Sequence, residues 1–283
     1  MKKQLIMEKA LELFAKQGFE ATSVQQITDY CGISKGAFYL SFKSKDELII
    51  ALIDQFMMQI IADIDYLVKN AKDSQLLYDF YYAIYHSFQK HSDFAKVLMK
   101  EQSQTFNKDL ILKMQYYDKL LENNILLMIE RLYGDEVKAT KYDLMYCIKG
   151  FMNMYSQLFV FYNVPLDLQV LSESLVEKTT LLARHMTVPF VTEELSQMFT
   201  QPMKEEGTKE QLGKIIEQKI DEMEESIEKE SLLLLRQELL EPSQPPAVVK
   251  GLLENIRNHP HCKWISYLLR QYFYTWIDKE QPM

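Results

Sequence analysis

Glycine and proline are scarce in this sequence, and their scarcity restricts the possible folds more than any other feature. The 283 residues include only 8 glycines and 8 prolines. Because these residues supply most tight turns and helix ends, so few of them in a long chain favour long helices with few connections. Apolar residues recur at helical spacing rather than in strict alternation, and we find no internal repeat or low-complexity tract. The sequence therefore predicts an all-α protein.

The first 48 residues predict a run of short helices. The first helix is amphipathic, and Gly18 is placed to end it. Thr22-Ser23 offers an N-cap for a second helix, which Gly32 ends. Ser34 caps a third short helix, and Ser44 opens a sequence of the capping-box form S-x-x-E where a long fourth helix begins. The second and third helices together predict a helix-turn-helix.

The rest of the chain predicts longer helices. We expect four or five of them between about residues 75 and 186, and a further break near Pro189 introduces a C-terminal region. There, a single charged amphipathic helix is expected over about residues 209–240, followed by one or two last helices, and the segment over residues 264–276 is markedly apolar. The breaks expected within the central helices lie near residues 91–93, 134–135 and 163–165.

Charge is distributed unevenly along the chain. Residues 1–45 carry seven lysines and four acids, a net charge of +3, which leaves −11 for the remainder of a chain whose net charge is −8. A basic end on an acidic body fits a protein whose end meets a polyanion and whose body does not. The alternative is chance clustering of lysines on a solvated face.

Cysteine usage points to a reducing compartment, and hydropathy indicates no segment that inserts into a membrane. The three cysteines lie far apart and none forms a CxxC pair. The N-terminal segment lacks the apolar core and cleavage site of a signal peptide, and no apolar run approaches the ~20 residues that span a bilayer. We therefore expect a cytoplasmic protein without membrane insertion.

The sequence offers little chemistry for catalysis or metal binding. In the run His259–Cys262, Pro260 disrupts regular helical spacing, and a structural zinc site takes four ligands. Cys147 and Ser156 have no histidine or acid at a meaningful spacing. No glycine-rich phosphate loop or HExxH motif occurs. We therefore expect no catalytic residue, no metal site, no cofactor and no enzyme activity.

The stretch CGISKGAFYLSFKSKDEL, residues 31–48, places small residues, hydroxyls and lysines on an expected helix surface. Gly36 and Ala37 have little bulk, so the start of the third helix can approach a DNA groove closely. Glycine in a helix costs about 1 kcal/mol relative to alanine, so a functional gain should compensate. Lys35 can reach a base edge or a phosphate, and the Tyr39 hydroxyl can donate to a phosphate. Tyr39 has an alternative role as a packing residue.

Three expected helix N-termini, at Ser23, Ser34 and Ser44, present backbone amides that suit anionic oxygens. The serines have an alternative role as plain N-caps, and the two roles are compatible. Lys45 stands at one of these N-termini, where the helix dipole disfavours a cation unless an anion is near. Contact with a polyanion would explain this position.

A larger set of residues keeps a characteristic order and spacing over about residues 3–50. Its members are Gly18-Phe19, Ala21-Thr22-Ser23-Val24, Ile27, Gly32-Ile33-Ser34-Lys35-Gly36, Phe38-Tyr39, Phe42, Lys45 and Leu48. In these residues the chain resembles the N-terminal domain of TetR/AcrR-type transcriptional regulators. The resemblance implies an all-helical homodimer that binds a palindromic operator in double-stranded DNA, with a larger C-terminal domain that binds a small effector and dimerises.

The resemblance also assigns roles to individual residues. Thr22 and Ser23 would contact phosphate at the start of the second helix. Tyr39 and Lys45 would hold the DNA backbone, whereas Leu40 falls where members of the family vary. The full set of expected DNA contacts is Thr22, Ser23, Ser34, Lys35, Gly36, Ala37, Tyr39 and Lys45. Phe38, Phe42 and Ile27 are assigned to the core of the small domain and not to DNA.

Aromatic and methionine residues gather in the central region and are candidates for an apolar effector site. The existence of a pocket rests on the family resemblance, and for each residue the alternative is a place in the ordinary core. His86, Gln102 and Asn153 are the candidate polar groups that would orient a small hydrophobic effector. The expected effector residues are Tyr85, His86, Phe88, Gln102, Tyr117, Phe151, Asn153 and Tyr155.

Two long helices, about residues 141–162 and 168–186, are apolar on more than one face and predict a dimer seam. The alternative is that the chain's own tail covers them. Almost 100 residues follow Met186, more than similar regulators often have. The expected domains are a DNA-binding domain at 1–48 (helix-turn-helix about 23–42), an effector and dimerisation domain at 49–187 and an additional helical extension at 188–283.

These features predict a DNA-binding transcriptional regulator, a repressor that leaves its operator when a small hydrophobic effector binds. A second hypothesis is a helical small-molecule-binding or adaptor protein that does not bind DNA. The sequence does not identify the operator, the effector, the regulated genes or the role of the extension.

Overall fold

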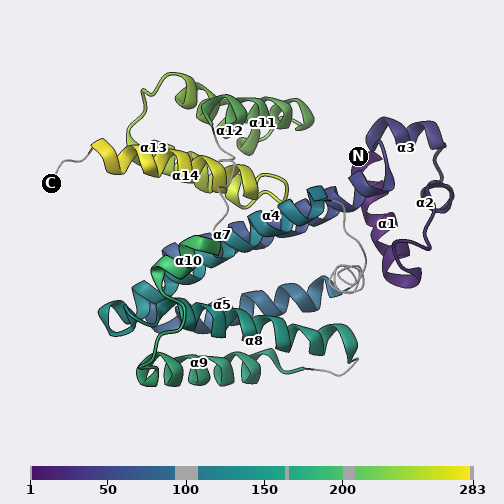
Figure 1. Ribbon diagram of the computed structural model, residues 1–283. Coiled ribbons are helices and arrows are strands. Elements are labelled where there is room, and N and C mark those ends of the chain that lie inside the picture. Colours follow the sequence, from purple (N-terminus) through teal and green to yellow (C-terminus); the bar gives the residue numbers. More distant parts are fainter. Residues whose placement is uncertain (1, 93–107, 163–165, 200–207, 281–283) are drawn as a thin grey trace. The chain divides into compact units, whose positions relative to one another are not determined.

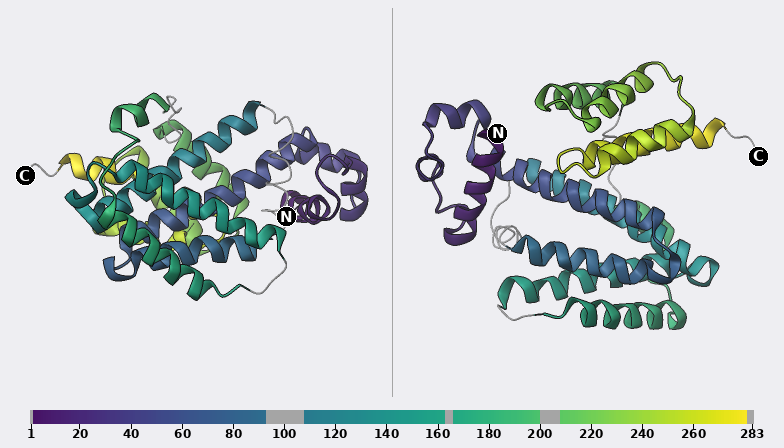
Figure 2. Two further views of the ribbon diagram at one scale, coloured as in Figure 1. Left: turned by 60° about the horizontal axis from the view of Figure 1, so that its bottom comes forward. Right: turned by 180° about the vertical axis from the view of Figure 1, so that it is seen from behind.

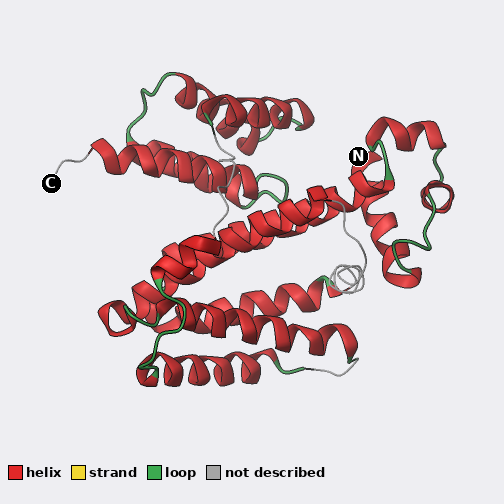
Figure 3. Ribbon diagram, viewed as in Figure 1, coloured by secondary structure: helices red, strands yellow, loops and turns green. Residues whose placement is uncertain are grey.

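The all-α prediction is confirmed. The computed structural model describes residues 2–92, 108–162, 166–199 and 208–280, and every regular element within these ranges is a helix (Figures 1 and 3). No helix in the described part of the chain combines the length and apolar character needed to cross a membrane. The chain divides into two compact units, Met1–Thr200 and Gln201–Met283. Residues 188–199, expected in the extension, therefore belong to the first unit.

The N-terminal helices begin and end at the residues that the local sequence signals. Gly18 and Gly32 follow the first two helices with φ values of 92° and 65°, a conformation that only glycine adopts without strain. Ser23 forms a full capping box with Gln26, because each side chain accepts the other's backbone N–H. The helices are α1 (Lys2–Gln17), α2 (Val24–Cys31), α3 (Lys35–Ser41) and α4 (Lys45–Asn70).

The cap of α4 differs in one bond from the expected capping box. The Ser44 hydroxyl accepts the Glu47 N–H at 3.0 Å, as the S-x-x-E pattern predicts. The Glu47 carboxylate, however, accepts the N–H of Lys43 at 2.6 Å instead of the N–H of Ser44. The carboxylate reaches one residue further back, so it caps the turn that precedes the helix.

Helix α4 takes part in two separate cores of the first unit. Its first half, from Leu48 to Phe56, packs with the buried residues of α1, α2 and α3. Its second half contributes Ile64 and Val68 to a core formed with the later helices. The expected domain boundary at residue 48 thus falls at the start of one continuous helix that extends from the small core into the larger one (Figure 1).

The larger core lies among the long helices of the first unit. Helix α4 packs along α7, which in turn packs on α8, whereas α5 packs on both α8 and α9 (Figure 2). Tyr81 and Tyr85 of α5 are completely buried there. Breaks near residues 91 and 134 are confirmed by the ends of α5 and α7. The elements are α5 (Asp73–Lys90), α7 (Lys108–Tyr133), η1 (Gly134–Val137), α8 (Lys141–Phe161), α9 (Leu168–His185) and α10 (Glu193–Phe199).

The second unit corrects one prediction. The single helix expected over about residues 209–240 is two helices, α11 (Lys209–Glu222) and α12 (Ile227–Leu240), which pack against each other. Ser226 caps α12 by accepting the Lys229 N–H. The helical apolar pattern continues through the break, but folding back buries Leu212 and Ile216 in the same unit as Leu235. Helices α13 (Pro246–Arg257) and α14 (Lys263–Glu280) complete the unit.

Candidate nucleic-acid interface

Helix α3 is anchored through the aromatic residues on its inner face. Phe38 and Phe42 are buried with Ile27 of α2 in the core of the small domain, as the sequence predicts. Phe38 meets the ring of Tyr39 edge to face at a centroid distance of 5.4 Å. Buried aromatic residues fix the orientation of this seven-residue helix, so its opposite face is held toward solvent.

Among the described residues of the first unit, no helix packs on the outer face of α3. Tyr39 is 52% exposed and Leu40 is 91% exposed, while Lys35 and Gly36 are also exposed. A Cβ atom added at Gly36 would meet only the Ser34 hydroxyl, at 3.8 Å. Because this helical residue has no positive φ and has open space beside it, nothing in the described part of the first unit requires glycine there. The small residue therefore leaves room for something outside the chain.

The three serines that precede α2, α3 and α4 act as N-caps. The hydroxyls of Ser23 and Ser34 accept the N–H groups of Gln26 and Ala37, each at 3.2 Å. Ser44 does the same for α4. All three serines are exposed, so capping leaves their hydroxyls at the surface. Phosphate contact by Ser23 and Ser34 remains a prediction.

Thr22 has a different place from the one the sequence predicts. Its side chain is fully buried, and its hydroxyl donates to the Gly18 carbonyl at 2.7 Å while accepting from Gln17 Nε2 at 3.1 Å. A buried hydroxyl with two internal partners does not suit the expected phosphate contact, and Thr22 has a structural role instead. The hydroxyl holds the turn between α1 and α2, which positions the N-terminus of α2.

Lys45 has partners within the chain that the sequence does not reveal. Its ammonium group donates to the carbonyl of Phe19 at 2.7 Å and lies 4.2 Å from the centroid of the Phe19 ring. A second, longer hydrogen bond of 3.4 Å reaches the Glu20 carbonyl. These contacts hold a cation at the N-terminus of α4 without a bound anion. The unusual position of Lys45 is thus explained in the free protein, and phosphate contact remains a prediction.

Part of the expected effector set comes together as an aromatic cluster of α5 and α8. The Tyr85 hydroxyl donates to the Phe151 carbonyl at 3.0 Å, and its ring stacks on Phe159 at 5.7 Å. Phe88, Phe151 and Tyr155 are half-buried against the same core. Burial raises the pKa of the Tyr85 hydroxyl well above its ordinary value, so the group is a neutral donor.

The other expected effector residues lie elsewhere. His86 is exposed and stacks on Tyr82 at 6.0 Å, and Asn153 is also exposed. The expectation that they are polar groups inside the aromatic cluster is therefore wrong. Both side chains lie at the surface and not in the core. Gln102 falls outside the described residues. Tyr117 is buried, but it serves a contact between α4 and α7.

That contact is a polar junction that the sequence analysis missed. The Tyr117 hydroxyl donates to Asp54 Oδ1 at 2.9 Å, and the Lys113 ammonium lies 3.2 Å from Asp54 Oδ2. Asp54 therefore ties α4, which begins next to the small domain, to α7 in the larger core. A carboxylate directly after the apolar run LIIALI was the signal available in the sequence.

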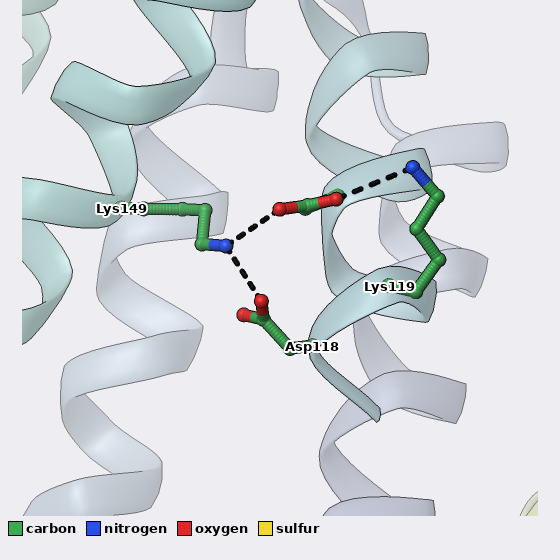
Figure 4. Close-up of polar contacts among 4 residues, drawn as sticks. Asp118, Lys119 and Lys149 are labelled. Carbon is green, nitrogen blue, oxygen red and sulfur yellow. Dashed lines mark hydrogen bonds and ion pairs between the residues drawn. The ribbon is translucent and has the colours of Figure 1, made fainter. Parts of the chain in front are cut away.

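A second polar group joins α7 to α8 (Figure 4). The ammonium of Lys149 donates to Asp118 Oδ2 at 2.8 Å and to Glu122 Oε1 at 2.7 Å. Glu122 also accepts from Lys119 at 3.3 Å. Burial alone would lower the pKa of Lys149, but the hydrogen bonds to the two carboxylates outweigh it and raise the pKa. Lys149 thus stays charged and fixes the rotation of α8 about its own axis.

Helices α8 and α9 present apolar side chains to solvent. On α8, Tyr146 and Met154 are 44% and 60% exposed and share one face with the exposed Gly150. On α9, Val170 and Leu181 are 60% and 51% exposed. Within the described residues of the first unit, neither of these faces is covered as a core would be, which suits the expected dimer seam.

Comparison with known proteins agrees with this geometry. Residues 6–52 match the model of the bacterial regulatory proteins of the tetR family. YerO, an uncharacterized HTH-type transcriptional regulator of Bacillus subtilis (strain 168), is 29% identical over 90% of this chain and 89% of its own.

Solved structures share the fold of somewhat less than two thirds of the chain. A transcriptional regulator of Aquifex aeolicus VF5 is 24% identical, with a TM-score of 0.50 over 64% of this chain and 99% of its own. FadR of Bacillus subtilis, solved in complex with stearoyl-CoA, is 20% identical, with a TM-score of 0.50 over 62% of this chain and 96% of its own. Each of these matches leaves more than a third of this chain uncovered.

The matched residues 6–52 are those that bury the inner face of α3 and leave its outer face open. The N-terminal domain of the chain is that of the tetR family of bacterial regulatory proteins, and the likeness to an HTH-type regulator over most of its length supports a DNA-binding transcriptional regulator of this type.

Proposed function

We propose that the protein is a repressor that binds a palindromic operator as a homodimer and leaves it when a small hydrophobic effector binds. The observation that carries the proposal is the outer face of α3, where Gly36 leaves open space beside the exposed Lys35 and Tyr39. A helix of this kind fits the major groove, where close approach brings side chains to base edges. Ser23, Ser34, Ala37 and Lys45 would complete the contacts around it.

Two copies are required because one seven-residue helix reads few base pairs. The exposed apolar faces of α8 and α9 support a four-helix seam between two protomers, and Lys149 holds α8 in a fixed rotation against α7. The substitution Leu181→Glu would place two charges in this seam and should convert the dimer into a monomer in analytical ultracentrifugation. A matched substitution on the exposed surface of the second unit, Leu233→Glu, should leave the dimer intact.

The aromatic cluster around Tyr85 supports a hydrophobic effector. Half-buried aromatic side chains adapt to an apolar ligand, and a structure with the same fold was solved with stearoyl-CoA. We therefore propose a long-chain fatty acyl compound as the effector. Stearoyl-CoA should release the operator in a fluorescence anisotropy assay, whereas coenzyme A alone should not. Retention of the operator at saturating stearoyl-CoA would contradict this choice of effector.

The Asp54 junction offers a route from the effector to the DNA. A ligand that moves α7 would also move α4 through Tyr117 and Lys113, and α4 begins at Lys45 beside the helix-turn-helix. His91, at the end of α5, also packs edge to face on Phe56 of α4 at 5.3 Å. A small rotation of α4 in each protomer changes the spacing of the two α3 helices, and two half-sites tolerate little change in spacing.

The function as a whole is tested by selecting bound sequences from a random DNA library with the purified protein. The expected result is a palindromic sequence whose affinity falls steeply with salt concentration. Lys35→Gln and Tyr39→Phe should weaken binding, with thermal stability unchanged because both side chains are exposed. Failure to select any sequence at low salt would contradict the proposal.

A further inference from the structure

Leu40 is the most exposed large apolar side chain among the described residues, at 91%. A single exposed leucine is common on protein surfaces, so exposure alone has no functional meaning. Its position is what matters, because Leu40 lies on α3 between Phe38 and Phe42, which are both buried. Leu40 adds nothing to the small core, and packing therefore does not explain the choice of a large apolar residue there.

Leu40 and Gly36 share one face of α3. Residues four apart are neighbours on a helix surface, and helical side chains lean toward the N-terminus. The Leu40 side chain therefore projects over the turn that contains Gly36, where the chain leaves open space. The face of α3 that is best placed for close approach thus combines an empty turn with a protruding apolar group that neither donates nor accepts hydrogen bonds.

The apolar feature that the major groove offers is the C5 methyl group of thymine. We propose that Leu40 is a specificity-determining residue that recognises this methyl group in each operator half-site. The inference rests on the proposed binding of DNA through α3. Burial of one methyl group should contribute about fourfold to affinity, and two half-sites should together contribute about fifteenfold.

The experiment replaces thymine by deoxyuridine, which lacks only the methyl group. Each thymine of the selected operator is replaced in turn, in both half-sites together, and binding is measured by fluorescence anisotropy. The wild-type protein should lose about fifteenfold at one position. Leu40→Ala should bind the unmodified operator more weakly and should be indifferent to the loss of the methyl group at that same position, while it responds normally elsewhere.

Two further variants separate apolar contact from shape. Leu40→Met keeps an apolar side chain and should keep the preference for thymine over deoxyuridine, whereas Leu40→Asn has a similar size and should lose it. Since Leu40 is exposed, all three variants should melt at the wild-type temperature, which excludes misfolding as the cause.

The inference is overturned if every thymine replacement affects wild type and Leu40→Ala equally, or if none affects the wild type. If the protein does not bind DNA through α3, the result differs from both of these outcomes, because the wild-type protein would then bind no unmodified DNA. That result also overturns the role of Leu40.

Discussion

Replacing Gly36 by alanine should stabilise the protein and weaken its binding to DNA. Alanine has a higher helix propensity than glycine, by about 1 kcal/mol in the interior of a helix. Gly36 is the second residue of α3, so we expect about half of that gain. The new Cβ would meet only the Ser34 hydroxyl at 3.8 Å, an ordinary contact, and no internal clash offsets the gain. The urea midpoint should rise by about 0.25 M, given an m-value of about 2 kcal/mol/M.

The same methyl group should obstruct the approach of α3 to the groove. Extra methyl groups in closely packed cores cost about 1 to 3 kcal/mol each, and a cost of about 1.4 kcal/mol at the protein–DNA contact corresponds to about tenfold per half-site. A dimer meets this cost twice, so operator affinity should fall by about a hundredfold in a filter-binding or anisotropy titration. Stability and affinity thus move in opposite directions, which a general folding defect does not produce.

Gly251→Ala is the matched control. Gly251 also lies in a helix, α13, with no atom within 4 Å of an added Cβ. This variant should be more stable than wild type and should bind the operator with unchanged affinity. Tight operator binding by Gly36→Ala would refute the explanation of why glycine is present in α3.

The remaining predictions concern stability, electrostatics and coupling. Gly32→Ala should lower the free energy of unfolding by about 1 to 2 kcal/mol because the residue has φ of 65°, whereas Gly32→Asn should cost less in the same urea titration. Lys45→Met removes the bonds to the Phe19–Glu20 loop and should cost about 1 kcal/mol. It should also make the slope of log K for operator binding against log salt concentration shallower by about 2 per dimer. An unchanged slope would show that Lys45 bonds only to the Phe19–Glu20 loop and does not contact phosphate. Tyr117→Phe loses the hydrogen bond from the hydroxyl to Asp54. This variant should bind the operator with unchanged affinity but should need more effector before it releases the DNA. An unaltered release curve would show that this junction does not link effector binding to DNA release. Burial raises the pKa of the Cys262 thiol to about 11, so alkylation of Cys262 by iodoacetamide at pH 8 should be slow until the second unit unfolds.

Features of the small domain that depend on local backbone chemistry were predictable from the sequence. Gly18 and Gly32 end helices because a left-handed residue is needed there, and Ser34 caps α3 through an amide only three residues away. The burial of Phe38 and Phe42 follows from helical spacing. In each case the partners are close in sequence, so a short pattern contains the whole interaction.

Features that depend on distant partners were not predictable in this way. Thr22 has a hydroxyl suited to phosphate, and only the turn from Gly18 shows that it is used internally. Lys45 bonds to a loop about 26 residues earlier, and Asp54 meets Tyr117 across 63 positions. The break between α11 and α12 arises because two halves of one apolar stripe pack on each other, which spacing along the chain does not reveal.

The exposure of Tyr39 and Leu40 in the presence of DNA tests the central claim most directly. Hydroxyl-radical oxidation, read by mass spectrometry, measures solvent access to both side chains with and without the operator. Bound operator should protect Tyr39 and Leu40, and Tyr82, 36% exposed on α5, should be oxidised as before. Equal oxidation of Tyr39 and Leu40 in the free and DNA-bound protein would show that this face of α3 does not enter the groove.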